Sequence, residues 1–234
     1  MEPFTHLHVA SGYSLRYGAS DPAALVRTAA GHGMDTLALT DRDGLYGAVK
    51  FVLACRAARI APALGVDLVV ERTGLVAGLP SWADPGREGP RGTPGRGGAV
   101  AGPRVTVLAL GKDAGGGRGP GAGWARLCRL VSAVHRRGGR GRPTATAELV
   151  AAHAFADADA DAGGRAALVV LLGPDSEVGR AVLARRPDLA QAVLRRWQSL
   201  LPQASLAVEI VCHHAPAGRP ASVGHAARML AAAR

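Results

Sequence analysis

The chain has 234 residues, 48% hydrophobic and 4% aromatic, enough for one large domain or two small ones with a core of Ala, Val and Leu. Its 3 cysteines are too few and too widely spaced for a disulfide scaffold or a cysteine-based zinc module, and no apolar run reaches the roughly 20 residues of a membrane span. The formal net charge is +10, and Lys50 and Lys112 are the only lysines among 28 basic residues. An excess of arginine is what GC-rich codons would produce, so the charge alone leaves DNA binding open. We expect a cytoplasmic protein without membrane attachment.

Residues 5–70 predict strands alternating with helices. Asp21 followed by Pro22 is typical of a helix start, because the Asp side chain caps free N–H groups and proline lacks an N–H there. The predicted elements are a strand over Thr5–Val9, a helix from Pro22 to about Gly31, a strand over Thr36–Leu39, a helix over Leu45–Ile60 with an apolar side of Val49, Val52, Leu53 and Ala57, and a strand over Leu64–Val70. Short connections between alternating elements indicate a parallel α/β sheet or barrel.

The composition changes over residues 72–103, which hold nine glycines and five prolines and show neither a helical nor a strand period. We interpret this stretch as a Gly/Pro/Arg-rich flexible insertion on the surface. Two roles remain open for it, a tolerated insertion or a basic arm that contacts DNA.

Regular structure is predicted again after residue 104. The expected elements are a strand over Val105–Leu110, a helix over Trp124–Val134, a basic loop over Arg136–Arg142, a helix over Glu148–His153, an acidic loop over Ala154–Gly164, buried parallel strands over Ala166–Leu172 and Leu206–Cys212, one helix or a pair broken at Pro187 over Glu177–Leu201, and a final helix over Ala221–Arg234. The three cysteines lie in apolar stretches and are expected to be small core residues.

Two short motifs carry candidate metal chemistry. His6 and His8 lie on one face of a strand, because side chains alternate with a period of two, and paired imidazoles can begin a zinc site. The loop Thr40–Gly44 follows a strand and holds Asp41 and Asp43. These carboxylates could bind a metal at the mouth of a barrel or merely cap the next helix and the turn.

The chain as a whole resembles a known family. The segment from His6 to Leu68 contains the phrases SL-x-x-G-A, L-x-L-T-D-x-D-G-L-Y-G-A-V-K-F and G-V-D-L, and similarity resumes at VTVLALGKD, ALVVLLG and LAVEIVCHHAP. This string resembles the PHP (polymerase and histidinol phosphatase) domain of bacterial family C DNA polymerases, which include the DNA polymerase III alpha subunits and the error-prone polymerases, and it looks closest to the error-prone group.

The resemblance implies a distorted seven-stranded α/β barrel whose strand ends hold up to three metal ions for phosphoesterase or 3′–5′ exonuclease chemistry. It also implies that residues 1–234 form a PHP domain that lacks the last ligand-bearing strand, with the insertion at 72–103 inside it. The fold class expected is therefore α/β, an incomplete distorted (β/α)7 barrel.

The ligand positions of the family are only partly retained. The matching candidate metal ligands are His8, Asp41, Asp67 and His213, and the positions where a family ligand is replaced are Ala10, Tyr17 and Arg42. A cluster of divalent ions needs several anionic or imidazole ligands, so these replacements predict a degenerate site. We expect Arg42 to pair with Asp41 or Asp67, and we expect no cofactor or at most a residual Zn²⁺ or Mn²⁺ ion.

The function implied is that of the PHP region of a DNA polymerase used in replication or translesion repair synthesis. Its role would be structural or partner-docking, since the metal site is degenerate. The catalytic palm domain of the family is not in this chain, so the chain alone is not expected to polymerise DNA. Partners expected through the parent polymerase are DNA and polymerase-associated proteins. One alternative is a metal-dependent phosphoesterase or 3′–5′ exonuclease that uses the residual ligands. Another is direct nucleic-acid contact through Arg136, Arg137, Arg140 and Arg142.

Overall fold

The computed structural model describes residues 4–79, 102–111, 121–139, 141–154, 166–201 and 203–234. Its elements are α1 (Pro22–Gly31), β1 (Thr36–Arg42), α2 (Ala48–Ala58), β2 (Ala61–Val69), β3 (Arg104–Ala109), α3 (Ala122–Arg137), α4 (Ala147–Ala154), β4 (Leu168–Leu172), α5 (Glu177–Leu183), α6 (Pro187–Gln198), the 3-10 turn η3 (Gln203–Ser205), β5 (Leu206–Val208) and α7 (Val223–Ala232). Most of the predicted insertion, the acidic loop from residue 155 onwards and Arg140 lie outside the described residues.

The strands form one sheet in the order β1-β2-β3-β4-β5. The pairs β1–β2 and β4–β5 are parallel, while β3 runs antiparallel to both of its neighbours. The α/β class is thus confirmed, and the sheet stays open among the described strands, as predicted for an incomplete barrel. The wholly parallel arrangement was wrong, because the long connection between β2 and β3 returns the chain to the sheet in the opposite direction.

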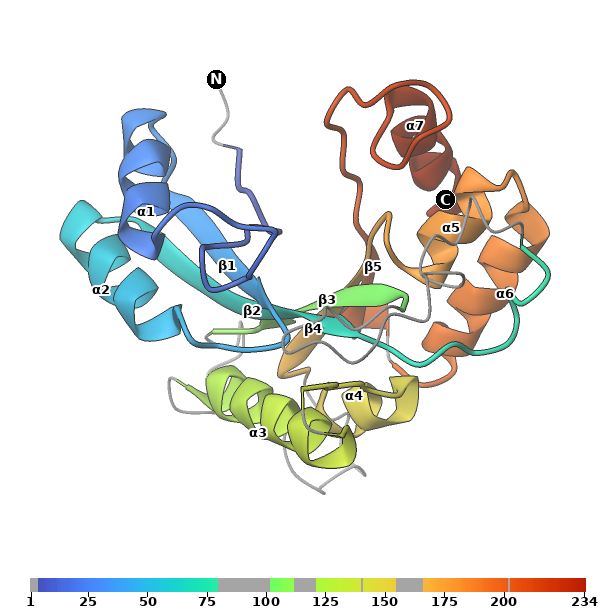
Figure 1. Ribbon diagram of the computed structural model, residues 1–234, viewed down its shortest axis with the longest axis horizontal. Helices are drawn as coiled ribbons and strands as arrows, with labels where there is room; N and C mark the ends of the chain where they lie inside the picture. The colour runs from blue at the N-terminus through green and yellow to red at the C-terminus, as the bar shows by residue number, and fades with distance from the viewer. Residues whose placement is uncertain (1–3, 80–101, 112–120, 140, 155–165, 202) are drawn as a thin grey trace.

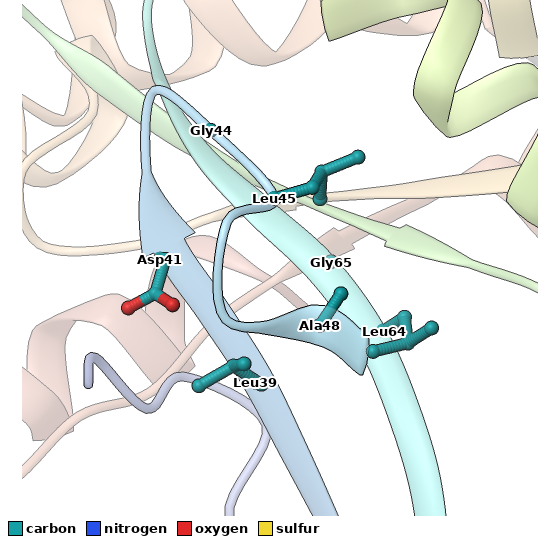
Figure 2. Close-up of a pocket in the computed structure, with 7 residues that line it drawn as sticks. All are labelled: Leu39, Asp41, Gly44, Leu45, Ala48, Leu64 and Gly65. Atoms are coloured by element: carbon teal, nitrogen blue, oxygen red, sulfur yellow. The ribbon is translucent and has the colours of Figure 1, made fainter. Parts of the chain in front are cut away.

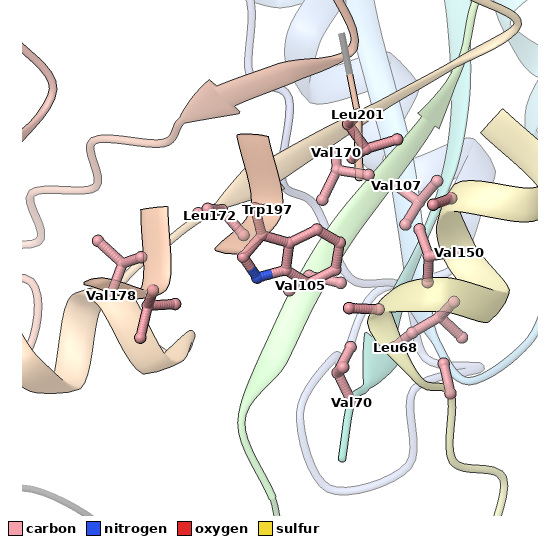
Figure 3. Close-up of a cluster of buried hydrophobic side chains, with 14 of the residues drawn as sticks. Leu68, Val70, Val105, Val107, Val150, Val170, Leu172, Val178, Trp197 and Leu201 are labelled. Carbon is pink, nitrogen blue, oxygen red and sulfur yellow. The ribbon is translucent and has the colours of Figure 1, made fainter. Parts of the chain in front are cut away.

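The helices surround the sheet in three groups (Figure 1). α1 and α2 lie beside β1 and β2, α3 and α4 form a layer under the central strands, and α5, α6 and α7 gather at the end near β4 and β5. The main core lies between the sheet and the last two groups. There, Trp197 of α6 packs among side chains such as Val105 and Leu172 from the strands (Figure 3).

Several helix boundaries follow directly from the sequence. Asp21 caps α1 by accepting a hydrogen bond of 2.9 Å from the Ala23 N–H, with Pro22 in the first turn. The helical stretch after residue 176 is a pair, as one alternative predicted, and Pro187 begins its second member. Fixed backbone geometry and a missing N–H make proline favourable at that place.

The packed side of α2 is not the one predicted. Ala48, Phe51 and Cys55 are buried, whereas Val49 and Leu53 are 70% and 59% exposed. Because all residues of α2 except Lys50 and Arg56 are apolar, the spacing of its hydrophobic residues did not separate the packed face from the exposed one. The helix packs through its bulkiest side chain, Phe51, which joins a second core cluster with residues of α1 and β1.

The two ends of the sheet are less regular than predicted. The Thr5–Val9 segment makes one parallel bridge, His6 with Leu37, instead of a full strand. At the other end β5 stops at Val208 and its residues are not buried, because it is an edge strand that the chain leaves after three residues. Cys212 is therefore exposed and Cys128 only half-buried, so the prediction that all three cysteines belong to the core holds for Cys55 alone.

The first residues of the 72–103 segment pack against the domain. Val76 and Leu79 are buried in the main core. Thr73 donates hydrogen bonds from its N–H and its hydroxyl to the two carboxylate oxygens of Glu177, at 3.0 and 2.8 Å. Burial raises the pKa of Glu177, and the Thr73 bonds oppose this effect. The described start of the segment is thus anchored at α5.

Candidate functional site: an ion-paired face of the sheet

The register of the sheet brings polar residues from three strands into one row. Arg42 at the end of β1 is the pairing partner of Asp67 in β2, and Asp67 is the pairing partner of Thr106 in β3. Residues in register on neighbouring strands project to the same face. This face is opposite to the one on which Leu68 and Val107 enter the main core. These three side chains therefore form a polar strip on this face of the sheet, which we call the polar row (Arg42, Asp67 and Thr106).

Asp67 is the centre of a buried ion-pair network. Its Oδ2 accepts a hydrogen bond of 2.8 Å from Arg104 Nε and lies 3.2 Å from Arg42 Nε. Arg104 is only 6% exposed and also donates from Nη2 to the Asp67 carbonyl oxygen at 2.7 Å and to Asp43 Oδ1 at 2.9 Å. The structure thus shows the Arg42 pairing predicted from the sequence, with Asp67 as the partner, and adds a second arginine.

The pKa values of this network respond to burial and charge in opposite directions. Burial raises the pKa of Asp67, and the charges of Arg104, His8 and Arg42 oppose that rise. For Arg104, burial lowers the pKa, but the carboxylates of Asp67 and Asp43 outweigh it, so its pKa lies above the usual value. A guanidinium held by two carboxylates in a buried place stays charged, and each charge depends on the others for compensation.

Asp41 belongs to a separate hydrogen-bond cluster. Its Oδ1 accepts from the Ser11 N–H at 2.7 Å and from the Ser14 hydroxyl at 2.7 Å, and its Oδ2 accepts from the Ser11 hydroxyl at 2.8 Å. Ser14 Oγ in turn accepts a 2.9 Å bond from the Arg42 N–H. The carboxylate therefore holds the loop from Ser11 to Ser14 against the end of β1.

A small pocket lies beside Asp41, and Figure 2 shows Leu45 and Leu64 on one side of β1 with the Asp41 carboxylate on the other. It leaves no space for a water-sized molecule, whereas typical ligand pockets measure roughly 300–1,000 Å³. Its lining residues are Leu39, Asp41, Gly44, Leu45, Ala48, Leu64 and Gly65. This pocket is a packing defect between β1, β2 and α2 and not a substrate site.

His8 connects the two ends of the sheet. Its Nδ1 lies 3.1 Å from Glu209 Oε2, directly after β5, and 3.3 Å from Thr106 Oγ1, while its Nε2 is 4.0 Å from Asp67 Oδ2. Burial lowers the pKa of His8, but the hydrogen bond to Glu209 and the charges of Glu209 and Asp67 outweigh it, so the pKa is raised. The N-terminal segment and the chain after β5 are thus tied across the polar row.

Two residues of this site escaped the sequence analysis. Glu209 lies inside the apolar run predicted as a strand over Leu206–Cys212, and the available signal was a lone carboxylate within that run; the structure ends the strand at Val208 and places Glu209 directly after it. Gly173 admits it, since a Cβ at that position would lie 2.4 Å from Glu209 Oε2. Arg104 had no such signal: it adjoins the Gly/Pro/Arg-rich segment, and only the antiparallel course of β3 brings it to Asp67.

The other predicted site residues lie in different surroundings. His213 is exposed, and the hydrogen bond it makes among the described residues is from its own N–H to the Ala221 carbonyl. Ala10 is half-buried beside the Ser11 loop. Tyr17 and Arg42, two of the replaced ligand positions, contact each other, with the guanidinium carbon 3.2 Å from the centre of the ring.

These residues do not fit a cluster of metal ions. The Asp41 oxygens are occupied by Ser11 and Ser14, and the Asp67 oxygen facing the row accepts from two guanidinium groups. A divalent ion at Asp67 would lie next to both arginines, which repel it. Within the described ranges, no group of three or more His, Cys, Asp or Glu side chains is arranged to hold a metal.

The basic loop is only partly available to a nucleic acid. Arg136 and Arg142 are exposed, and Arg140 lies outside the described residues. Arg137 Nη1 is 2.5 Å from Glu71 Oε1, and this ion pair neutralises it. His135 Nε2 lies 2.6 Å from the Asp43 carbonyl oxygen and links the end of α3 to the β1–α2 loop.

Together these features define a mixed α/β domain with a charged face at the ends of its central strands. The model of the PHP domain family matches residues 6–213, and the chain belongs to that family. Error-prone DNA polymerases of Nocardia farcinica and Cutibacterium acnes are 29% and 32% identical over 242 and 216 residues. Both alignments cover 92% of this chain but only 19% and 16% of the relatives, so the chain spans about a fifth or less of their length.

Similarity also extends to a solved structure. An amidohydrolase from Chromobacterium violaceum is 21% identical, with a TM-score of 0.33 over 56% of this chain and 33% of that chain. In the part of the chain that the structure describes, there is no helix with the length and apolar character needed to cross a bilayer.

Proposed function

We propose that this chain serves as the PHP domain of an error-prone DNA polymerase, and that its role there is structural and partner-docking instead of hydrolytic. The support for the parent protein is the similarity to error-prone polymerases along most of the chain. In this proposal residues 1–234 are one domain that contains the 72–103 insertion. Template-directed DNA synthesis would belong to the remainder of a longer polypeptide, with DNA and polymerase-associated proteins as partners in the cytoplasm.

The observation that carries the structural role is the bonding of Asp67. Arg104 and Arg42 approach its Oδ2 at 2.8 and 3.2 Å, where a metal-dependent site would need a free carboxylate. Because Arg104 is buried, its displacement from Asp67 by an ion would leave a buried guanidinium that keeps only Asp43 as carboxylate partner and lies next to the charge of the ion. The arginines thus provide the positive charge that a cation would otherwise supply.

The His8–Glu209 contact supports a bracing role for this arrangement. It joins residues 201 positions apart, at the two ends of the sheet, beside the polar row. A sheet whose ends are tied by a charge-assisted hydrogen bond keeps its curvature without a metal. The polar row then acts as an internal brace that maintains the surfaces of the domain for its partners.

The test compares metal binding and hydrolysis in the purified chain and three variants. We expect no stoichiometric zinc or manganese by elemental analysis, and no hydrolysis of bis-p-nitrophenyl phosphate or of a 3′-labelled oligonucleotide after addition of Mn²⁺ or Zn²⁺. Arg42→His places an imidazole in the polar row, and Arg27→His is the matched control on the exposed face of α1. Stoichiometric metal with hydrolysis that His8→Ala abolishes would overturn the proposal and establish the phosphoesterase or exonuclease alternative.

A further inference from the structure

The outer face of α3 carries arginines that face solvent. Arg129 and Arg136 are exposed and lie seven positions apart, so they project from the same side of the helix about 10 Å apart along its axis. Ser132, also exposed, lies between them. The opposite side is formed by Leu127, Leu130 and Val134, which are fully buried in the main core. The orientation of α3 is therefore determined by its core side, and the arginines must point outwards.

No acidic side chain of α3 balances this face, since the helix Ala122–Arg137 contains neither Asp nor Glu. The acidic residues near it are engaged elsewhere. Glu71 is paired with Arg137, Glu148 with Arg196, and Asp43 with Arg104. Among the residues that the structure describes, Arg129 and Arg136 have no carboxylate partner, so no described residue neutralises their charges.

The turn after α3 adds a third arginine to the same end of the helix. Gly139 and Arg142 form a bridge, and the Arg142 N–H donates a 2.8 Å hydrogen bond to the Gly139 carbonyl oxygen. Gly138 makes this return possible, because a Cβ there would come within 2.2 Å of the Arg142 carbonyl oxygen. Arg142 is exposed, and its backbone is held against the end of α3. We call Arg129, Arg136 and Arg142 the α3 arginine face.

We propose that the α3 arginine face binds the phosphate backbone of double-stranded DNA without sequence preference. This inference rests on the proposed function, which places the domain in a protein that works on DNA. Guanidinium groups bind phosphate oxygens in a bidentate geometry, and a row of such groups on a helix contacts successive phosphates. α3 lies on the side of the domain away from α1, α2 and α7 (Figure 1).

Exposed arginines also occur on helices that bind nothing but water. Arg137, whose charge is compensated by Glu71, therefore serves as an internal comparison for Arg136. Its guanidinium is paired with Glu71, and the negative charge of that carboxylate offsets the attraction of Arg137 for a phosphate. If any exposed arginine of this end of α3 sufficed, Arg137 would contribute as much as Arg136. In the proposal, Arg136 contributes and Arg137 does not.

The experiment measures binding of the full chain to a fluorescent 20-base-pair duplex by anisotropy between 50 and 200 mM NaCl. Each phosphate contact contributes about 0.9 to the slope of log K against log salt. We expect the triple variant Arg129→Gln, Arg136→Gln, Arg142→Gln to lose about 2.7 from that slope. Arg137→Gln should leave the slope unchanged, and two duplexes of unrelated sequence should bind equally.

The matched control is the triple variant Arg27→Gln, Arg56→Gln, Arg59→Gln, which removes the same charge from exposed positions at α1 and α2. Retention of the wild-type slope in this control supports the proposal. Equal losses in both triple variants would overturn it in favour of a diffuse effect of net charge, and tighter binding of single-stranded RNA or of polyglutamate would also overturn it. Circular dichroism of every variant verifies folding, and failure here would leave the metal and hydrolysis results of the proposed function untouched.

Discussion

Arg104 and Asp67, 37 positions apart in the sequence, form a buried ion pair in which Nε lies 2.8 Å from Oδ2. The two side chains are 6% and 2% exposed, and the same guanidinium also binds the Asp67 carbonyl oxygen. A buried pair adds little stability relative to apolar residues, but the removal of one partner leaves a charge without compensation. Asp67 and Arg104 therefore form a unit, and mutagenesis should show it.

Asp67→Asn or Arg104→Met alone is expected to lower the free energy of unfolding by about 3–5 kcal/mol, because each removes the nearest counter-charge of a buried group and leaves only Asp43 for Arg104 or Arg42 for Asp67. The double variant Asp67→Asn, Arg104→Met should lose much less than the sum of the single losses. Urea denaturation followed by circular dichroism measures all three. Arg186→Gln, which breaks an exposed pair with Asp188, is the control and should leave the midpoint unchanged. Additive losses in the double variant would contradict the coupling.

Ser14→Ala should destabilise the domain by about 1–3 kcal/mol, since the hydroxyl donates to Asp41 and accepts from the Arg42 N–H. Its removal takes this acceptor from the Arg42 N–H and leaves Asp41 with the Ser11 donors alone. Ser132→Ala is the matched control, because that exposed hydroxyl bonds only to the Cys128 carbonyl within α3. Thermal unfolding of the two variants decides the matter. Equal midpoints would show that the Ser11–Ser14 loop does not depend on Asp41.

The two sides of α2 should respond oppositely to truncation. Phe51→Ala is expected to cost about 3–5 kcal/mol, as for a buried aromatic side chain. Leu53→Ala, two positions away and 59% exposed, should change stability by no more than about 0.5 kcal/mol. Chemical denaturation of both variants tests the orientation of the helix. A large loss for Leu53→Ala would mean that the predicted side of α2, and not the observed one, is packed.

His225 should make the stability fall in acid. Its Nε2 lies 2.9 Å from the Gly179 carbonyl oxygen, and its Nδ1 accepts from the Ala221 N–H at 3.2 Å, so the ring is neutral in the fold. Burial and the charge of Arg228 lower its pKa, while Gly179 and Asp175 act in the opposite direction. The unfolded chain therefore takes up the proton first as the pH falls through about 6.5, and stability is lost from there downwards.

The measurement compares wild type and His225→Gln by urea denaturation between pH 8 and pH 5. The stability advantage of the wild type should be full at high pH and should shrink below pH 6.5. His8, whose pKa is raised, has the opposite dependence, with stability lost as the pH rises through its folded value, but it is present in both proteins and cancels. An advantage that grows in acid would contradict the neutral assignment of His225.

The three thiols should react with Ellman's reagent at different rates. Cys212 is exposed and is expected to react first, Cys128 more slowly, and Cys55 only after unfolding, because it is fully buried and burial raises its pKa to about 11. Cys212→Ser should remove the fast phase and leave the others. A fast phase that persists in this variant would place Cys212 in a protected environment.

Local features of the chain were sufficient for many elements. The Asp21–Pro22 start of α1 and the apolar strands β2, β3 and β4 depend on capping and short-range patterns and were predicted, and the break at Pro187, which depends on proline geometry, was one of two alternatives. The PHP family was also evident from the linked motifs alone. Three features were not predicted: the direction of β3, the side of α2 that packs and the early end of β5. Each depends on contacts with surfaces that are distant in the sequence.

The sequence by itself determined the α/β class, the family and the replacement of a ligand position by Arg42. Only the tertiary structure decided what these replacements do. An ion-pair network needs atoms within about 3–4 Å, and Asp67, Arg104 and Glu209 reach that distance through strand register and direction, which no local pattern encodes. In the same way, neutralisation of Arg137 and not of Arg136 arises from contact with the distant Glu71. The composition determines the net charge, whereas the fold determines which charged side chains lack a partner of opposite charge.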